Sequence, residues 1–333
     1  MARKPTAVDL RLLSKVSKLY YEQKLTQQEI ARRLHLSRPK VSRLLQRAQE
    51  AGLVQITVSS PMGGFADLEH QLEARFGLQE VVVVDVDHTT SRDMVARELG
   101  IAAADYLQRI LQDGDIIGVT WGTTLHAMVN ALRPYEAQDV HVVQLIGGLG
   151  APEAEVHATT ICRRIARLLN GKLTLIPAPG IVDSLATKQA LLSDSHVQRA
   201  YERFAEITVA FVGIGVPTPE SVVMRDGSIM REEQLDVVLA AGAVGDIGLR
   251  FFDANGQPIA SALDDLVIGI SLAQLQQIER VVGVAGGLEK QAAVCGALDS
   301  RLISVLITDH QLARVLVDCP ANDAPPSTQF TPS

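Results

Sequence analysis

Residues 1–60 show apolar positions that recur every three or four residues, the period of an amphipathic helix. One such stripe covers residues 10–21. A second helix is predicted to begin after Thr26 and to run to about Leu34, because Thr26 and Glu29 have the spacing of a capping box at its start. The chain therefore opens with short helices.

A third helix is predicted from its N-cap, Ser37, to about Ala51. Pro39 lies in its first turn, where a missing N–H costs nothing, and Gly52 is a suitable stop. The segment 53–58 then alternates apolar and polar residues in the manner of a strand. We interpret it as the wing of a winged helix.

Residues 59–64, Ser-Ser-Pro-Met-Gly-Gly, form the clearest break in the pattern and are the predicted linker. They separate a first domain over 1–60 from a second over 61–320, which begins with a connecting or oligomerising helix over 67–76. The tail 321–333 is rich in Pro and polar residues, a composition typical of disorder.

From residue 80 onward, short β-branched runs that end in Gly or Asp alternate with stretches compatible with helices. This alternation indicates βα units and a parallel sheet covered by helices on both faces. The predicted strands are 81–86, 116–119, 140–146, 173–176, 207–212, 281–284 and 303–307. The predicted fold class is therefore α/β, with an N-terminal winged helix-turn-helix before a parallel-sheet domain.

Charge changes the picture, because the overall net charge of −7 conceals an asymmetry. Residues 1–60 hold 12 Lys and Arg against 4 Asp and Glu, a net of +8. The remainder holds 19 against 34, a net of −15. A basic head on an acidic body indicates that only the head binds a polyanion such as DNA, although a basic helix can also be a solvated face.

The cysteines Cys162, Cys295 and Cys319 are far apart and form no C-x-x-C pair. Their odd number and spacing argue against a disulfide framework or a zinc site and are typical of a reducing cytoplasm. The N-terminus lacks the apolar core of a signal peptide, and no run approaches ~18 apolar residues. We expect a cytoplasmic protein with no membrane partner, no metal and no cofactor.

Residues 27–46 carry the pattern of a helix-turn-helix, in which apolar residues face inward from two helices and small Ala31 lets them cross closely. The inward-facing residues are Ile30, Leu34, Leu36, Val41 and Leu44. His35 stands where the turn usually has Gly and must adopt a left-handed conformation. The alternative is a small amphipathic bundle that binds protein.

The second helix of this motif presents polar and basic side chains that could enter a major groove. Arg38 and Arg43 are the candidates for base contact, since a guanidinium can bind guanine with two hydrogen bonds. Lys40 and Arg47 are better placed to neutralise phosphates. The full predicted DNA-binding set is Ser37, Arg38, Lys40, Ser42, Arg43 and Arg47.

Four glycine-bearing segments are predicted to follow strands, and open α/β sheets bind ligands at the carboxyl ends of their strands. In the first, Gly122-Thr123-Thr124, small residues admit a ligand close to the backbone. The helix that begins there offers free N–H groups to an anion, for which phosphate is the natural guest. The second segment is the apolar turn 144–150.

The third segment, 242–248, contains Asp246, which could accept hydrogen bonds from sugar hydroxyls or could simply cap a turn. The fourth, 284–290, contains Lys290, which could neutralise a phosphate or be an ordinary surface lysine. Both alternatives stay open at this point.

Enzyme motifs are missing from the sequence. No G-x-G-x-x-G follows a predicted strand, and there is no Walker motif, no G-x-S-x-G elbow and no H-x-x-x-H pair. The chain is therefore not expected to be an enzyme. Two rivals remain: an enzyme acting on sugar phosphates with an accessory DNA-binding head, and a redox or metal sensor.

Taken in order, these segments resemble the SorC family (SorC/DeoR-type) of sugar-sensing transcriptional regulators from residue 16 to 316. The matching marks are 25–31 (Leu-Thr-Gln-Gln-Glu-Ile-Ala) with 40–45, then 118–124, 147–148, 176–179, 212–215, 245–247 with 251–253, 284–287 with Lys290, and 306–309. The resemblance implies an effector domain related to sugar-phosphate isomerases and deaminases that need not catalyse anything.

The resemblance also implies an allosteric regulator of a carbohydrate or signal-uptake operon that binds operator DNA and a phosphorylated sugar or related metabolite. A homo-oligomer, dimer or tetramer, is implied as well. Carried over by position, one group of residues would hold the phosphate and another would line the sugar. The implied effector-binding set is Gly122, Thr123, Thr124 and Lys290 for the phosphate, and Gln144, Gly147, Gly148 and Asp246 for the sugar.

Overall fold

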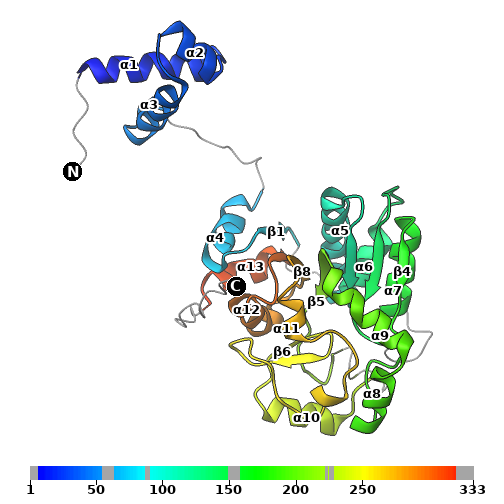
Figure 1. Cartoon of the computed structure of the whole chain (residues 1–333). Coiled ribbons are helices and arrows are strands. Elements are labelled where there is room, and N and C mark those ends of the chain that lie inside the picture. Colours follow the sequence, from blue (N-terminus) through cyan, green and yellow to red (C-terminus); the bar gives the residue numbers. More distant parts are fainter. Residues whose placement is uncertain are drawn as a thin grey trace, which may run out of the picture. The chain divides into compact units, whose positions relative to one another are not determined.

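The chain divides into two compact units, residues 1–64 and 65–333, in a computed structural model of the protein (Figure 1). The structure describes residues 7–54, 64–86, 91–148, 158–221, 224 and 229–319. The segment 55–58, most of the linker 59–64 and the tail 321–333 lie outside the described residues. The wing, the linker and the disordered tail therefore stay predictions.

The N-terminal unit is helical, as the apolar periodicity predicts. Its helices are α1 (Ala7–Ser17), α2 (Gln27–Arg33) and α3 (Arg38–Glu50), with a π-helical turn, Lys18–Glu22, after α1. The three helices enclose one apolar core, because their inward-facing residues fall on one side of each helix. This core includes Leu13, Val16, Ile30, Val41 and Leu44.

The ends of these helices have the predicted chemistry. The Thr26 backbone N–H donates to Glu29 Oε2 at 2.8 Å, and the Glu29 N–H donates to Thr26 Oγ1 at 3.3 Å, which completes the capping box. Ser37 is the N-cap of α3, although its side chain makes no capping hydrogen bond. His35 has φ +52° and Gly52 has φ +69°, so both adopt the expected left-handed conformation.

The second unit is built on a seven-stranded parallel sheet in the order β1-β9-β8-β5-β2-β3-β4, and every predicted strand is in it. Parallel strands buried on both faces require apolar residues at nearly every position, which explains the continuous β-branched runs. The strands are β1 (Glu80–Val84), β2 (Ile116–Val119), β3 (His141–Gln144), β4 (Lys172–Thr174), β5 (Val209–Gly213), β8 (Arg280–Val284) and β9 (Val305–Asp309).

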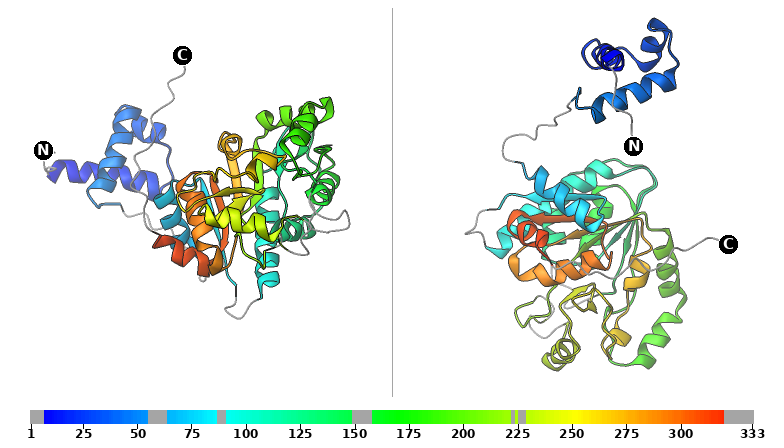
Figure 2. Two further views of the ribbon diagram at one scale, coloured as in Figure 1. Left: turned by 90° about the horizontal axis from the view of Figure 1, so that it is seen from below. Right: turned by 90° about the vertical axis from the view of Figure 1, so that its left-hand side faces the viewer.

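Helices cover both faces of this sheet (Figure 2). On one face lie α5 (Arg92–Ile110), α6 (Thr123–Ala131) and α7 (Ala158–Leu168). On the other face lie α4 (Ala66–Phe76), α9 (Ser195–Glu202), α12 (Gln291–Asp299) and α13 (His310–Val317). Shorter helices α8 (Leu185–Leu192), α10 (Glu232–Ala240) and α11 (Leu272–Leu275) lie in the connections.

A small antiparallel hairpin, β6 (Gly245–Ile247) and β7 (Arg250–Phe252), was not predicted. The segment 242–248 was expected to follow a strand, and this was wrong, because it follows α10 and forms β6 itself. Three-residue strands are too short for an alternating pattern to be recognised. The hairpin is anchored by buried Arg250, which donates to the backbone carbonyls of Ile270, Gly269 and Asp264.

The strand order places a switch point between β2 and β5. The chain leaves β2 for β3 on one side, and leaves β5 for β8 on the other. The loops after β2 and β5 therefore diverge and open a crevice at the carboxyl ends of these strands, which is where open α/β sheets bind ligands. The fold thus specifies where a ligand pocket belongs.

The cysteine expectation needs a correction. Cys295 in α12 and Cys319 after α13 form a disulfide, although the wide spacing predicted none. The two cysteines are far apart in the sequence, so no local pattern indicates the pairing. The fold brings them together, because α12 and α13 pack side by side on the sheet. Cys162 is a buried free thiol in α7, and burial raises its pKa to about 12.

Of the described helices, none has the length and apolarity that a bilayer crossing requires.

Candidate ligand pocket and nucleic-acid interface

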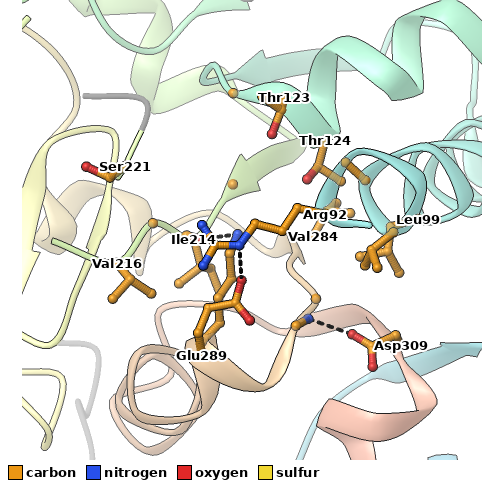
Figure 3. A pocket seen from close by; sticks show the side chains of 18 of the residues that line it. Arg92, Leu99, Thr123, Thr124, Ile214, Val216, Ser221, Val284, Glu289 and Asp309 are labelled. Atoms are coloured by element: carbon orange, nitrogen blue, oxygen red, sulfur yellow. Dashed lines mark hydrogen bonds and ion pairs between the residues drawn. The ribbon is translucent and has the colours of Figure 1, made fainter. Parts of the chain in front are cut away.

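A cavity of about 500 Å³ lies at the switch point, and its size suits a small-molecule ligand (Figure 3). Its walls come from the loops that follow β2, β5 and β8, from the start of α5 and from the β6–β7 hairpin. Five of the predicted effector-binding residues line it: Gly122, Thr123, Thr124, Asp246 and Lys290. These residues are distant in sequence, and the parallel sheet brings them to one edge.

The loop after β2 leads into an uncapped helix N-terminus at the cavity. Gly122 is the N-cap of α6 with φ +127°, and no side chain caps this end of the helix. The first N–H groups of α6 therefore have no side-chain partner at the positive end of the helix dipole. Thr124 is buried at the cavity wall, while Thr123 is exposed at its mouth.

Lys290 provides a half-buried positive charge that lines the same cavity. Its Nζ donates to the carbonyl of Ile214 at 2.9 Å. Burial lowers the pKa of Lys290, and the attraction of Glu289 and Asp246 opposes that shift. Lys290 is therefore not a freely solvated surface lysine, because it is half-buried at the cavity and its ammonium group donates to a backbone carbonyl.

Asp246 caps a turn, one of the two alternatives that the sequence left open, and it also lines the cavity. Its Oδ2 accepts the Leu249 N–H at 3.0 Å and so caps the β6–β7 turn, and its carboxyl group also lines the cavity. Burial raises its pKa to about 6, while the Leu249 N–H and Lys290 favour the charged form. A side chain at Gly215 would overlap the Asp246 carboxylate, so glycine is required there.

The sequence missed several residues of this cavity. Arg92, the first residue of α5, forms an ion pair with Glu289, with 3.2 Å between Nε and Oε1 (Figure 3). Ser221 Oγ is buried and has no hydrogen-bond partner among the described residues. The sequence could have indicated Arg92. A charged residue that begins the helix after the first strand lies at the carboxyl ends of the strands, where open α/β sheets bind ligands.

Gln144, Gly147 and Gly148, by contrast, are not among the cavity-lining residues. Gln144 is buried, donates from Nε2 to the Ile146 carbonyl at 2.6 Å, and leaves Oε1 without a partner among the described residues. The Gly148 N–H donates to the Ala178 carbonyl at 2.9 Å. In the structure these residues position the β3 loop against the segment around Ala178.

Gly147→Ala is expected to lower the free energy of unfolding by about 1–3 kcal/mol. A Cβ at this position would lie 2.5 Å from the carbonyl oxygen of Ala178, and a backbone atom cannot easily move away to relieve the overlap. Chemical denaturation of the full chain measures the loss. A variant as stable as the wild type but defective in ligand binding would instead return Gly147 to the ligand site.

The predicted nucleic-acid interface lies at the start and along the exposed side of α3. All six residues are exposed, Ser37 as the N-cap and the other five within the helix, whereas Val41, Leu44, Leu45 and Ala48 are buried. The Arg43 Nε donates to the Pro39 carbonyl at 3.3 Å, which holds the arginine along the helix. Arg32 and Arg33, in the last turn of α2, add basic side chains that the sequence analysis did not include.

A helix-turn-helix with a basic outer face, joined to a parallel α/β domain with a strand-end cavity, defines a ligand-responsive DNA-binding regulator. Residues 60–318 match the family model described as "Putative sugar-binding domain", and residues 19–64 match a MarR family model. The chain belongs to the SorC/DeoR-type family of sugar-binding transcriptional regulators, as the resemblance implied.

Similar proteins cover nearly the whole chain. The deoxyribonucleoside regulator of Bacillus subtilis is 35% identical over 92% of this chain and 97% of its own length. The sorbitol operon regulator of Klebsiella pneumoniae is 33% identical over 93% and 98%. The crystal structure of the full-length sorbitol operon regulator SorC from Klebsiella pneumoniae aligns with a TM-score of 0.71 at 32% identity, covering 94% of this chain and 100% of that one. These relatives are named as regulators and not as enzymes.

Proposed function

We propose that this regulator controls a carbohydrate-related operon and takes a phosphorylated sugar, or a related phosphorylated metabolite, as its effector. The observation that carries the proposal is the presence of half-buried Lys290 and the uncapped start of α6 in one cavity. A cation partly shielded from water and helical N–H groups without side-chain caps together favour a small dianion over a neutral ligand. Thr123 and Thr124 add hydroxyl donors.

The remainder of the cavity suits a polyhydroxylated body. Asp246, Glu220 and Ser221 line it, and the Ser221 Oγ is a buried hydroxyl without a hydrogen-bond partner in the part of the chain that the structure describes. Carboxylates accept hydrogen bonds from sugar hydroxyls, and a serine hydroxyl both donates and accepts. We assign Gly122, Thr123, Thr124 and Lys290 to the phosphate, and Asp246 with Ser221 to the sugar.

The DNA-binding role is assigned to residues 1–60 and the effector role to residues 61–320. Operators for helix-turn-helix proteins are read by two recognition helices in successive major grooves, so we propose a dimer or tetramer working on chromosomal DNA in the cytoplasm. The effector binds one conformation of the α/β unit more tightly and so changes operator affinity. A coupling of ~1–3 kcal/mol suffices for a switch.

A thermal-shift screen of the full chain against a panel of sugar phosphates tests the effector class. A ligand at a hundred times its Kd stabilises the folded state by about 2.7 kcal/mol, which corresponds to a rise in Tm of roughly 5–10 °C for a domain of this size. The unphosphorylated sugars are the matched controls. A panel in which neutral sugars stabilise the protein and their phosphates do not would contradict the proposal.

A further inference from the structure

The mouth of the cavity carries a second cation that is already paired. Arg92 begins α5 and forms its ion pair with Glu289, which lies in the short turn Leu288–Lys290 before α12. Both side chains line the cavity, and Figure 3 shows the ion pair between them. The pair therefore joins two elements that both contribute to the cavity wall.

The Glu289 carboxylate lies within the field of two cations. Besides its contact with Arg92, it makes the largest electrostatic contribution to the pKa of Lys290, and Arg92 acts on the same amine with the opposite sign. Its side chain folds back over its own turn, with Oε2 2.5 Å from the place where a Cβ on Gly287 would be. Glycine at 287, with φ +97°, allows this position. An anionic side chain thus occupies the place to which both cations attract an anion.

Glu289 holds this place weakly. The side chains of Arg92 and Glu289 are 72% and 43% exposed, and ion pairs so open to water contribute little to stability. Arginine can instead bind a phosphate with two parallel hydrogen bonds, which is the stronger arrangement. The buried carboxylates nearby are less free to move, because Asp246 accepts the Leu249 N–H and Asp309 accepts the Gly287 N–H.

We propose that Glu289 is an internal competitor for the anionic group of the effector. The phosphate displaces the Glu289 carboxylate from Arg92, and Arg92 then becomes the second cation beside Lys290. This inference rests on the proposed function of the cavity as a phosphate site. It adds a basis for selectivity, because a neutral sugar has no charge with which to compete with Glu289 for Arg92.

Titration of the full-length protein with inorganic phosphate by calorimetry, at constant ionic strength in chloride, tests the exchange. Glu289→Gln removes the competitor and is expected to tighten phosphate binding about fivefold, whereas Arg92→Gln is expected to weaken it on the order of tenfold. The double variant should bind no more tightly than Arg92→Gln alone, because the gain depends on Arg92. Melting curves establish that each variant is folded.

Asp93→Asn is the matched control, because Asp93 lines the same cavity and its replacement removes one negative charge without touching the ion pair. Glu289→Gln must tighten binding more than Asp93→Asn does. Equal tightening in both variants, or none in Glu289→Gln, overturns the competitor role. If Glu289→Gln fails this comparison while the wild type binds phosphate and Lys290→Met does not, the competitor role is lost and the proposed phosphate site stands. If no protein in the series binds phosphate, the proposed phosphate site falls with it.

Discussion

Lys290→Met is expected to abolish the response to the effector while operator binding stays intact. Lys290 is the half-buried, hydrogen-bonded cation of the cavity, and methionine keeps much of its volume while removing the charge. Truncating a hydrogen-bonded charge that contacts an anion costs about 3 kcal/mol, which is more than a hundredfold in Kd. Calorimetry with the effector, and with inorganic phosphate, measures the loss.

The matched control is Lys172→Met, since Lys172, on β4, forms an exposed ion pair with Asp139 and does not line the cavity. Unchanged effector affinity in Lys290→Met, or an equal loss in both variants, would count against the site.

The stability of the Lys290→Met variant should also depend on pH in a defined direction. Asp246, whose pKa is already raised to about 6, loses the cation that favours its charged form. Because the raised pKa means that the folded state binds the proton, stability should increase as pH falls from 8 through 6.

The second large effect is expected on DNA. Arg43→Ala should weaken binding to a selected operator duplex by about 1–3 kcal/mol per recognition helix and relax the preference at one base pair. Lys40→Ala and Arg47→Ala should instead weaken binding to all duplexes alike and reduce the salt dependence by about one unit per contact. Fluorescence anisotropy on duplexes selected by the protein from a random pool, across a range of salt concentrations, separates the two cases. If Arg43→Ala lowered affinity for all sequences equally, Arg43 would be a phosphate contact.

The elements that local pattern specifies are the ones that the sequence predicted well. The capping box at Thr26, the left-handed His35 and the seven sheet strands each depend on neighbours within a few residues, and all are present. Helical and strand periods are short-range signals, so one chain segment suffices to recognise them.

What could not be predicted depends on contacts between distant segments. The Arg92–Glu289 pair, the Cys295–Cys319 disulfide and the Asp246 cap each require the folded sheet. The Gly147-Gly148 pair shows the opposite difficulty. A glycine pair after a strand fits both a ligand site and a tight backbone approach, and only the position of Ala178 favours the second.

The most direct test of the central claim measures operator affinity with and without the sugar phosphate that the thermal-shift screen identifies. The basic N-terminal unit should bind duplex DNA tightly at low ionic strength. The effector should change that affinity several-fold to about a hundredfold in the wild type, and should have no effect in Lys290→Met. A protein that ignored duplex DNA at low ionic strength, or whose operator affinity was the same with and without the effector, would contradict it.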